Sequence, residues 1–359
     1  MGFRDYYRQF EEMAPEEISA ELLARRDERR RKAVTKLDPL DLSGTTWHEP
    51  PHPDAVNAAT FALRRAVNEP PDLAATALRE ALAARHGIAV GQVAAGHGAG
   101  ELLRALLWRV VGGGGEALIG WPGWQPLPGM VEAAGGRAVP VAPAPAELLA
   151  RAGGHTRAVI VTSPADPTGA LLRRRALRDL RARLPEHVLL IVDEALGEFA
   201  PDGEDAAGLV ADVPGLVVLR SFSKAHAMAG LRAGAALGPA ELVAQLAPSG
   251  GVSAPAQAAA SWALSPDGLA LARRRRVAAH AAHVQLAAAL AGSPVAAAPG
   301  GLPFAWLSSD AEDGPALAAR LAAAQVYVAP GRLWGDERHV RAALRGPQAI
   351  DRLAAALRS

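Results

Sequence analysis

Three short apolar runs of this sequence each end in polar or turn-forming residues. The runs and the segments that follow them are Ala158–Thr162 before Ser163–Gly169, Val188–Val192 before Asp193–Leu196, and Leu216–Arg220 before Ser221–Lys224. Strand-sized apolar runs of this kind are typical of buried parallel strands. Because ligands of a parallel sheet bind at the carboxyl ends of its strands, we expect these segments to form one shared site.

The residue types in these segments suit a phosphate-bearing, ring-containing cofactor. A lysine at a sheet edge, here Lys224, is a candidate to form a Schiff base with a carbonyl group. A carboxylate on a neighbouring strand, here Asp193, can hold a pyridinium nitrogen protonated. Ser221, Ser223 and Arg232 can bind a phosphate, and Gly96–Gly100 leads into a helix whose backbone N–H groups can bind an anion.

The elements that would position these residues alternate between helices and strands. The pattern predicts helices at 15–33, 57–67, 73–86, 99–111, 170–184, 240–247 and 255–264, and a further strand at Ala117–Ile119. The segment 38–56 contains Pro and Gly and is expected to be irregular. This alternation favours an α/β fold with a mostly parallel central sheet covered by helices on both faces.

The C-terminal third predicts a smaller α+β unit. A long helix is expected from 266 to 291, strands at Pro303–Leu307 and Val326–Val328, and a last helix at 347–357. The chain has 359 residues, which exceeds the ~250–300 residues at which single cores stop growing. We therefore expect a large domain over 46–265 and a small domain that joins 1–45 to 266–359.

Composition excludes several classes of protein and site. The 38 basic and 37 acidic residues nearly cancel, which argues against a nucleic-acid or membrane surface. There is no cysteine, so disulfides and thiolate chemistry are excluded, and the scattered histidines do not predict a metal site. The N-terminus lacks an apolar signal core and no run of about 18 apolar residues is present, so the cytoplasm is the default expectation.

The order and spacing of these segments resemble class I/II aminotransferases, which are fold-type-I pyridoxal-phosphate (PLP) enzymes, and especially their histidinol-phosphate aminotransferase-like branch. Ser221–Lys224 with Ala229–Arg232 resembles the SFSK-x4-AGLR signature of that family. Further matches to family motifs are Asp193–Leu196, Ser163–Gly169, Gly96–Leu102, Pro122–Trp124, Val326–Gly331 and His339–Arg341. The resemblance spans residues 40–357.

The resemblance implies a role for each matching residue. Lys224 would carry the cofactor as a Schiff base and move protons, and Asp193 would pair with its pyridine nitrogen. Trp124 would stack on its ring, and Asp166 stands where the family has an asparagine that donates to the cofactor's phenolic oxygen. The phosphate would be bound by Ala99, Gly100, Ser221, Ser223 and Arg232. Arg341 would bind the α-carboxylate of the substrate.

Several positions depart from the family pattern. Asp166 is an acceptor when ionised, and Leu196 replaces a tyrosine that reaches the same phenolic oxygen. Ala99 replaces the serine of the phosphate loop. Pro70 stands in a segment where relatives have a tyrosine that reaches the neighbouring subunit. His226 takes the place of a phenylalanine, either as a compensating donor or as a residue that packs there.

These observations predict a PLP-dependent aminotransferase that moves an amino group between an amino acid, or an amino-acid-derived phosphate ester, and a 2-oxo acid. Family members are homodimers, so a homodimer is expected, with small-molecule substrates as its other partners. Two alternatives stay open. One is a decarboxylase of the threonine-phosphate decarboxylase type, and the other is a non-catalytic binding protein that keeps the fold.

Overall fold

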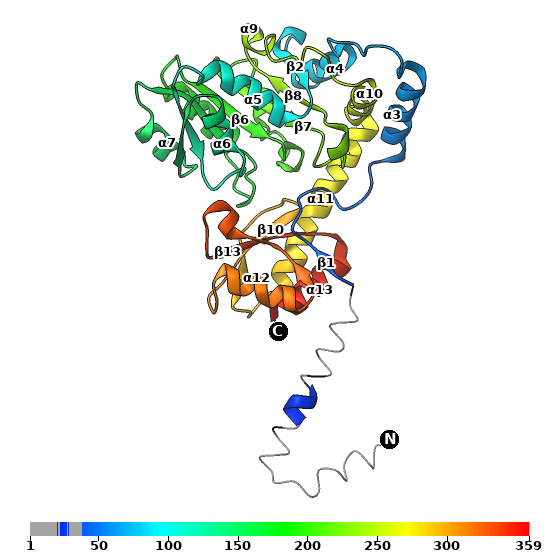
Figure 1. Ribbon diagram of the computed structural model, residues 1–359, viewed down its shortest axis with the longest axis vertical. Coiled ribbons are helices and arrows are strands. Elements are labelled where there is room, and N and C mark those ends of the chain that lie inside the picture. Colours follow the sequence, from blue (N-terminus) through cyan, green and yellow to red (C-terminus); the bar gives the residue numbers. More distant parts are fainter. Residues whose placement is uncertain (1–19, 21, 27, 29–37, 359) are drawn as a thin grey trace, which may run out of the picture.

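The computed structural model describes residues 20, 22–26, 28 and 38–358. Most of the helix predicted at 15–33 therefore lies outside the described residues. Figure 1 shows an upper body that contains a large sheet and a lower body that contains a small one. The predicted domain limits at 46 and 266 stay a proposal.

The upper body is built on a seven-stranded sheet with the order β2-β8-β7-β6-β5-β3-β4. Its strands are β2 Val93–Gly96, β3 Glu116–Gly120, β4 Arg137–Val141, β5 Thr156–Thr162, β6 Leu189–Glu194, β7 Leu216–Ser221 and β8 Gly234–Leu237. Strand β8 pairs antiparallel with both β2 and β7, and the other pairs are parallel. This arrangement confirms the predicted α/β fold with a mostly parallel sheet.

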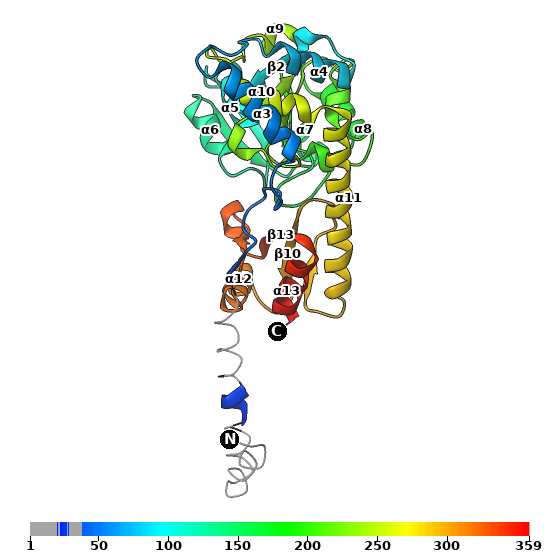
Figure 2. The same ribbon diagram turned by 90° about the vertical axis from the view of Figure 1, so that its right-hand side faces the viewer.

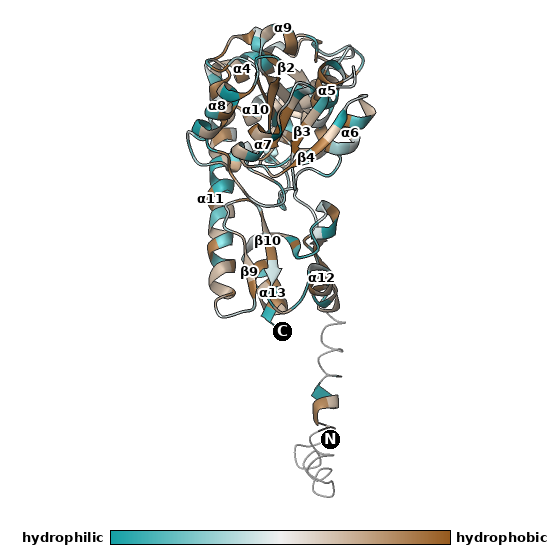
Figure 3. Ribbon diagram, turned by 90° about the vertical axis from the view of Figure 1, so that its left-hand side faces the viewer, coloured by the Kyte–Doolittle hydropathy of each residue, from teal (hydrophilic) through white to brown (hydrophobic). Residues whose placement is uncertain are grey.

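Helices cover both faces of this sheet because successive strand residues point to opposite sides. On β6, Leu190 and Val192 join one core cluster and Ile191 joins the other. The first cluster includes residues of α4, α8 and α10, and the second includes residues of α5 and α6. Figure 3 shows apolar residues along β3 and β4 inside this body. The helices of the upper body are α3 Pro53–Ala66, α4 Thr76–His86, α5 Ala99–Val110, α6 Leu127–Ala133, α7 Pro145–Arg151, α8 Arg174–Arg183, α9 Ala240–Val243 and α10 Ala254–Ala263.

The lower body contains a four-stranded antiparallel sheet, with the order β12-β13-β10-β9, and the parallel pair β1-β11. Its strands are β1 Leu40–Asp41, β9 Val295–Ala297, β10 Phe304–Ser309, β11 Val326–Tyr327, β12 Ala329–Pro330 and β13 His339–Ala343. Helices α12 Gly314–Ala323 and α13 Gly346–Arg358 contribute to the same apolar cluster as β10 and β13. Short 3-10 helices are η1 Val90–Gln92, η2 Gly197–Phe199, η3 Ala206–Leu209, η4 Ala229–Leu231 and η5 Gly331–Trp334.

Helix α11, Pro266–Ala289, joins the two bodies (Figure 2). Its Arg275 is buried and donates from Nη1 to the carbonyl oxygen of Ala225 at 2.7 Å and from Nη2 to that of Pro50 at 3.2 Å. The guanidinium carbon also lies 5.2 Å from the ring centre of Trp47. One side chain of α11 thus binds both the segment after Lys224 and the chain that leads into α3.

The predicted elements agree with the structure except at some short ones. The helix expected at 240–247 is limited to Ala240–Val243, and the segment 38–56 includes β1 and the start of α3. No helix in the part of the chain that the structure describes combines the length and the apolar character that a membrane span needs.

Candidate active site

One pocket of about 600 Å³ lies at the carboxyl ends of β5, β6 and β7. The polar side chains at these ends come together because β6 pairs with β5 on one side and with β7 on the other, with Asp193 opposite Thr162 and Leu219. The predicted cofactor residues that line the pocket are Ala99, Gly100, Trp124, Asp166, Asp193, Ser221, Ser223, Lys224 and Arg232. The sheet edge therefore gathers the residues that the sequence singled out.

Lys224 and Asp193 both line this pocket. Burial lowers the pKa of Lys224, an effect that Asp166 and Asp193 oppose and Arg341 adds to. The Lys224 amine donates a hydrogen bond to the Thr45 hydroxyl. Burial raises the pKa of Asp193, while the backbone N–H of Ala195, at 2.9 Å from Oδ1, and the charge of Lys224 act against the increase. An amine and a carboxylate thus lie within electrostatic reach of each other in a desolvated site.

The N-terminus of α5 forms one end of the pocket, at Ala99 and Gly100. The first backbone N–H groups of a helix have no partner within it and attract anions. Gly98 has φ +90°, and a Cβ there would lie 2.8 Å from Nη2 of Arg232. A glycine at this position thus lets the Arg232 guanidinium approach the start of the helix.

Two serines complete this cationic end. The hydroxyl of Ser221 accepts a hydrogen bond from the backbone N–H of Ser223 at 3.2 Å, and both residues line the pocket. Hydroxyl groups, helix N–H groups and a guanidinium together form the set of donors that a phosphate requires.

Trp124 forms a wall of the pocket close to α5. A Cβ at Gly100 would lie 3.1 Å from Cη2 of the Trp124 ring, so only a glycine leaves the ring in this position without a shift. The geometry therefore places a flat aromatic surface beside the donors of the α5 N-terminus.

Arg341 contacts the pocket through Asp166. Its Nη1 donates to Oδ1 of Asp166 at 2.6 Å, and its Nη2 donates to the carbonyl oxygen of Ser43 at 2.8 Å. The guanidinium carbon lies 4.7 Å from the ring centre of Trp334 and 5.5 Å from that of Phe304. The negative charge of Asp166 is thus balanced by an arginine, which the sequence did not indicate.

Leu196 and His226, two further departures from the family pattern, lie in different surroundings. Leu196 is buried against Trp47 and Phe199 and lines the pocket. His226 is 3% exposed, and its ring centre lies 5.6 Å from that of Phe222. Burial lowers the pKa of His226 to about 4. This environment favours the interpretation of His226 as a neutral packing residue over that of a donor to the cofactor.

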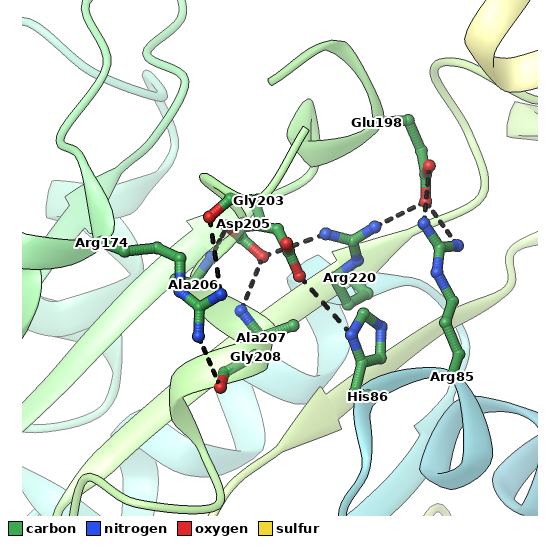
Figure 4. Close-up of polar contacts among 11 residues, drawn as sticks. Arg85, His86, Arg174, Glu198, Gly203, Asp205, Ala206, Ala207, Gly208 and Arg220 are labelled. Atoms are coloured by element: carbon green, nitrogen blue, oxygen red, sulfur yellow. Dashed lines mark hydrogen bonds and ion pairs between the residues drawn. The ribbon is translucent and has the colours of Figure 1, made fainter. Parts of the chain in front are cut away.

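A cluster of buried charged side chains links the carboxyl ends of β6 and β7 (Figure 4). Arg220, next to Ser221 on β7, donates to Glu194, next to Asp193 on β6, at 3.0 Å. Its other nitrogen Nη2 donates to Glu198 at 2.5 Å, and Glu198 also pairs with Arg85 of α4 at 2.9 Å. Burial alone would lower the pKa of Arg220, but Glu198 and Glu194 outweigh it and raise the pKa. Arg220 therefore stays charged and fixes β6 against β7.

Sequence reasoning missed several residues of the pocket. Thr45 is the hydrogen-bond partner of Lys224, and Thr46 lines the pocket, although both come from a segment expected to be irregular. Arg104 and Met130 line it from α5 and α6. No motif marks Thr45 or Thr46, since only the fold brings them to Lys224.

The residues present fit pyridoxal phosphate. The cavity volume, about 600 Å³, lies within the range that small-molecule cofactors occupy. Lys224 can bond to its aldehyde, Asp193 can pair with its ring nitrogen, and the end formed by α5, Ser221, Ser223 and Arg232 can bind its phosphate. Within the described residues, no group of three or more His, Asp or Glu side chains could hold a metal ion.

Residues 37–357 match the family model described as aminotransferase class I and II. A histidinol-phosphate aminotransferase of Rubrobacter xylanophilus is 41% identical over 54% of this chain and 57% of its own length. An aromatic amino acid aminotransferase of Corynebacterium jeikeium is 35% identical over 71% of each protein. The chain thus spans between about half and three quarters of these two relatives.

Solved structures agree with the sequence relatives. A Thermus thermophilus aspartate aminotransferase double mutant has a TM-score of 0.81 and 26% identity, with 98% of this chain and 99% of that chain covered. The histidinol-phosphate aminotransferase of Sinorhizobium meliloti, solved with pyridoxal-5'-phosphate, has a TM-score of 0.78 and 25% identity, with 91% and 92% covered. These matches confirm the resemblance seen in the sequence, the fold type and a family that uses PLP as its cofactor. The chain belongs to the class I and II aminotransferases.

Proposed function

We propose that this chain is a PLP-dependent aminotransferase that moves an amino group between an amino acid, or an amino-acid-derived phosphate ester, and a 2-oxo acid. One observation carries the proposal: Lys224, Asp193 and the phosphate-binding end formed by α5, Ser221, Ser223 and Arg232 line the same pocket. Membership in the family supports the reaction type. The relatives named above differ in substrate, so the amino donor is left open.

Each residue has a task that its position supports. PLP, when bound through Lys224, supplies an electron sink for charge that develops on the carbon beside the substrate's amino group. Asp193 holds a proton at the ring nitrogen, which a buried carboxylate can do as a charge-assisted hydrogen bond. Trp124, which lines the pocket beside Gly100, would pack against the cofactor and exclude water. Arg341 would orient the substrate by binding its carboxylate. Asp166, which forms an ion pair with Arg341, would affect the strength of that binding.

Lys224 would take up the proton from the substrate carbon that bears the amino group and later give it back. A general base is most effective when its pKa lies near the working pH. Burial lowers the pKa of Lys224 towards that range, so more of the amine is neutral and able to accept a proton. Thr45, which accepts a hydrogen bond from this amine, would hold the amine in position.

The quaternary structure and the domain limits are part of this proposal. We expect a homodimer, a large domain over 46–265 and a small domain that joins 1–45 to 266–359. Sedimentation of the purified chain would measure the first, and limited proteolysis would measure the second.

The test is the visible spectrum of purified protein with added PLP. We expect an absorption band that Lys224→Ala loses, because the chain has three lysines and Lys224 is the one that lines the pocket in the part of the chain that the structure describes. Lys36→Ala is the matched control and should keep the band. After borohydride reduction, the cofactor should be found on the peptide that contains Lys224.

A colourless protein that ignores PLP, or a band that survives in Lys224→Ala, would contradict the proposal. Product analysis with a panel of amino donors and 2-oxo acids then identifies the reaction. Release of CO2 in place of a keto acid would assign the chain to the decarboxylase alternative.

A further inference from the structure

Arg341, to which the family resemblance gives the substrate's carboxylate, already has a carboxylate partner in Asp166, which lines the pocket. Arg341 and Asp166 form an ion pair with an N–O distance of 2.6 Å, and their side chains are only 11% and 17% exposed. Burial strengthens such a pair, because the local dielectric constant is low and water competes little. In this site, any incoming carboxylate therefore meets an arginine whose charge is already compensated.

The guanidinium of Arg341 is also held in place. The ring of Trp334 lies 4.7 Å from its central carbon, and the carbonyl oxygen of Ser43 accepts from Nη2 at 2.8 Å. Strand β13, which carries Arg341, is paired on both sides, with β10 and with β12. Because backbone and ring are both fixed, Arg341 cannot easily turn away from Asp166 to meet a ligand.

The charge of Asp166 affects two other groups that line the pocket, Lys224 and Asp193. It opposes the lowering of the pKa of Lys224 by burial and adds to the increase in the pKa of Asp193, so both groups lie within its electrostatic reach. A substrate carboxylate placed on Arg341 would lie beside this negative charge. Like charges that share one cation repel each other, and the repulsion is larger where water is excluded.

We propose that Asp166 competes with the substrate's carboxylate for Arg341, so that the site discriminates against α-carboxylates and favours amines whose reacting carbon bears an uncharged group, such as an amino alcohol. This proposal rests on the proposed function, since a preferred substrate exists only if the chain is an aminotransferase. It adds the class of amine that the site would prefer. The 2-oxo acid partner, which carries a carboxylate, would bind weakly for the same reason.

The experiment measures binding of propionate, an unreactive monocarboxylate, to the full chain loaded with PLP. Isothermal titration calorimetry on wild type and Asp166→Asn should show at least about tenfold tighter binding in the variant, equivalent to ~1.4 kcal/mol. Tryptophan fluorescence offers a second signal, because the Trp334 ring lies 4.7 Å from the Arg341 guanidinium carbon. In Asp166→Asn combined with Arg341→Gln, the gain should be lost.

Asp202→Asn is the matched control, because it removes the same charge from an exposed aspartate that pairs with Arg276 on the protein surface. It should bind propionate like wild type. If Asp166→Asn does not fold, Asp166→Ala should show the same direction of change. A further measurement compares alanine with 2-amino-1-propanol through the change that each causes in the visible band, and the preference for the amino alcohol should fall in the Asp166 variant.

The proposal fails if wild type and both Asp166 variants bind propionate equally, or if none of them binds it measurably. It also fails if the gain persists without Arg341. Failure of the proposed function is a different result, since it appears as a protein without a visible band. The propionate titration can still be made on that cofactor-free full chain and decides the role of Asp166 independently.

Discussion

At the scale of single residues, His226 shows how a position near the active-site lysine can serve the fold. Its ring is 3% exposed, and within the described part of the chain neither ring nitrogen has a hydrogen-bond partner. A buried polar group without a partner costs about 1–3 kcal/mol. Burial also lowers the pKa of His226 to about 4, so the ring is neutral in the folded protein at neutral pH.

This pKa predicts how stability depends on pH. The unfolded chain takes up a proton near a pKa of ~6.5, whereas folded His226 does so only near 4. Protonation therefore favours unfolding, and stability is lost as pH falls from 6.5 towards 4. At pH 5 the loss attributable to His226 is about 2 kcal/mol.

His226→Phe should raise the free energy of unfolding at pH 7 and remove this part of the pH dependence. Urea unfolding at pH 7 and pH 5 measures both effects. His187→Phe, at an exposed position, is the control and should leave the pH dependence as it is. An unchanged difference between the two pH values in His226→Phe would show that another group carries it.

At the scale of elements, the ends of β6 and β7 depend on the buried charges behind them. Arg220 is bound by Glu194 and Glu198, and Glu194 also accepts the backbone N–H groups of Ala206 and Ala207. Burial acts against the charge of Glu198, but Arg220 and Arg85 outweigh it and hold the pKa of Glu198 below its usual range. Its contribution is therefore present at neutral pH and lost only as pH falls through that low pKa.

Glu194→Gln should lower the free energy of unfolding by about 3 kcal/mol, because removing one partner leaves part of a buried charge uncompensated. Chemical denaturation at pH 7 measures the change. Asp179→Asn is the control, since its pair with Arg175 is 3.8 Å long and both side chains are exposed. Equal stability of the two variants would mean that Arg220 finds sufficient compensation in Glu198.

The sequence predicted the long elements and the strand-end segments, but not strands β2, β4 and β8. Strands β2 and β8 read Val-Ala-Ala-Gly and Gly-Ala-Ala-Leu, and alanine and glycine give little strand signal. Strand β4 contains Pro140, and a proline within an apolar run weakens the signal for a strand, although it is tolerated in β4 at the sheet edge.

Contacts within the site were harder to predict than its members. Motif order indicated Lys224, Asp193 and Arg232 because each lies in a local signature. The bond from Lys224 to Thr45 and the ion pair from Arg341 to Asp166 join residues 179 and 175 positions apart. Such pairs depend on how the lower body packs against the edge of the large sheet, and no short sequence pattern predicts that packing.

At the scale of the whole molecule, α3 exposes large apolar side chains. Val56, Phe61 and Leu63 are 45%, 62% and 47% exposed, and Val67, just after the helix, is 74% exposed. Ala55 and Ala59 of the same helix pack against the core of the upper body. A group of exposed apolar side chains marks an interaction surface, and we expect the proposed homodimer to bury it.

Phe61→Glu should weaken self-association, because a charge would have to be buried in that contact. Sedimentation equilibrium measures the association constant, and the visible band checks that the fold is intact. Val277→Glu is the control, at a side chain of α11 that is 66% exposed. Equal association of both variants would place the dimer contact elsewhere.

Arg275 has a consequence for any attempt to produce the two bodies separately. It belongs to α11, beyond the predicted end of the large domain at 265, yet it binds the carbonyl oxygens of Ala225 and Pro50 within that domain. A fragment cut at this limit would lose the guanidinium that holds the peptide next to Lys224. A useful expression fragment of the upper body therefore has to keep the first turns of α11, and the functional boundary lies inside a helix.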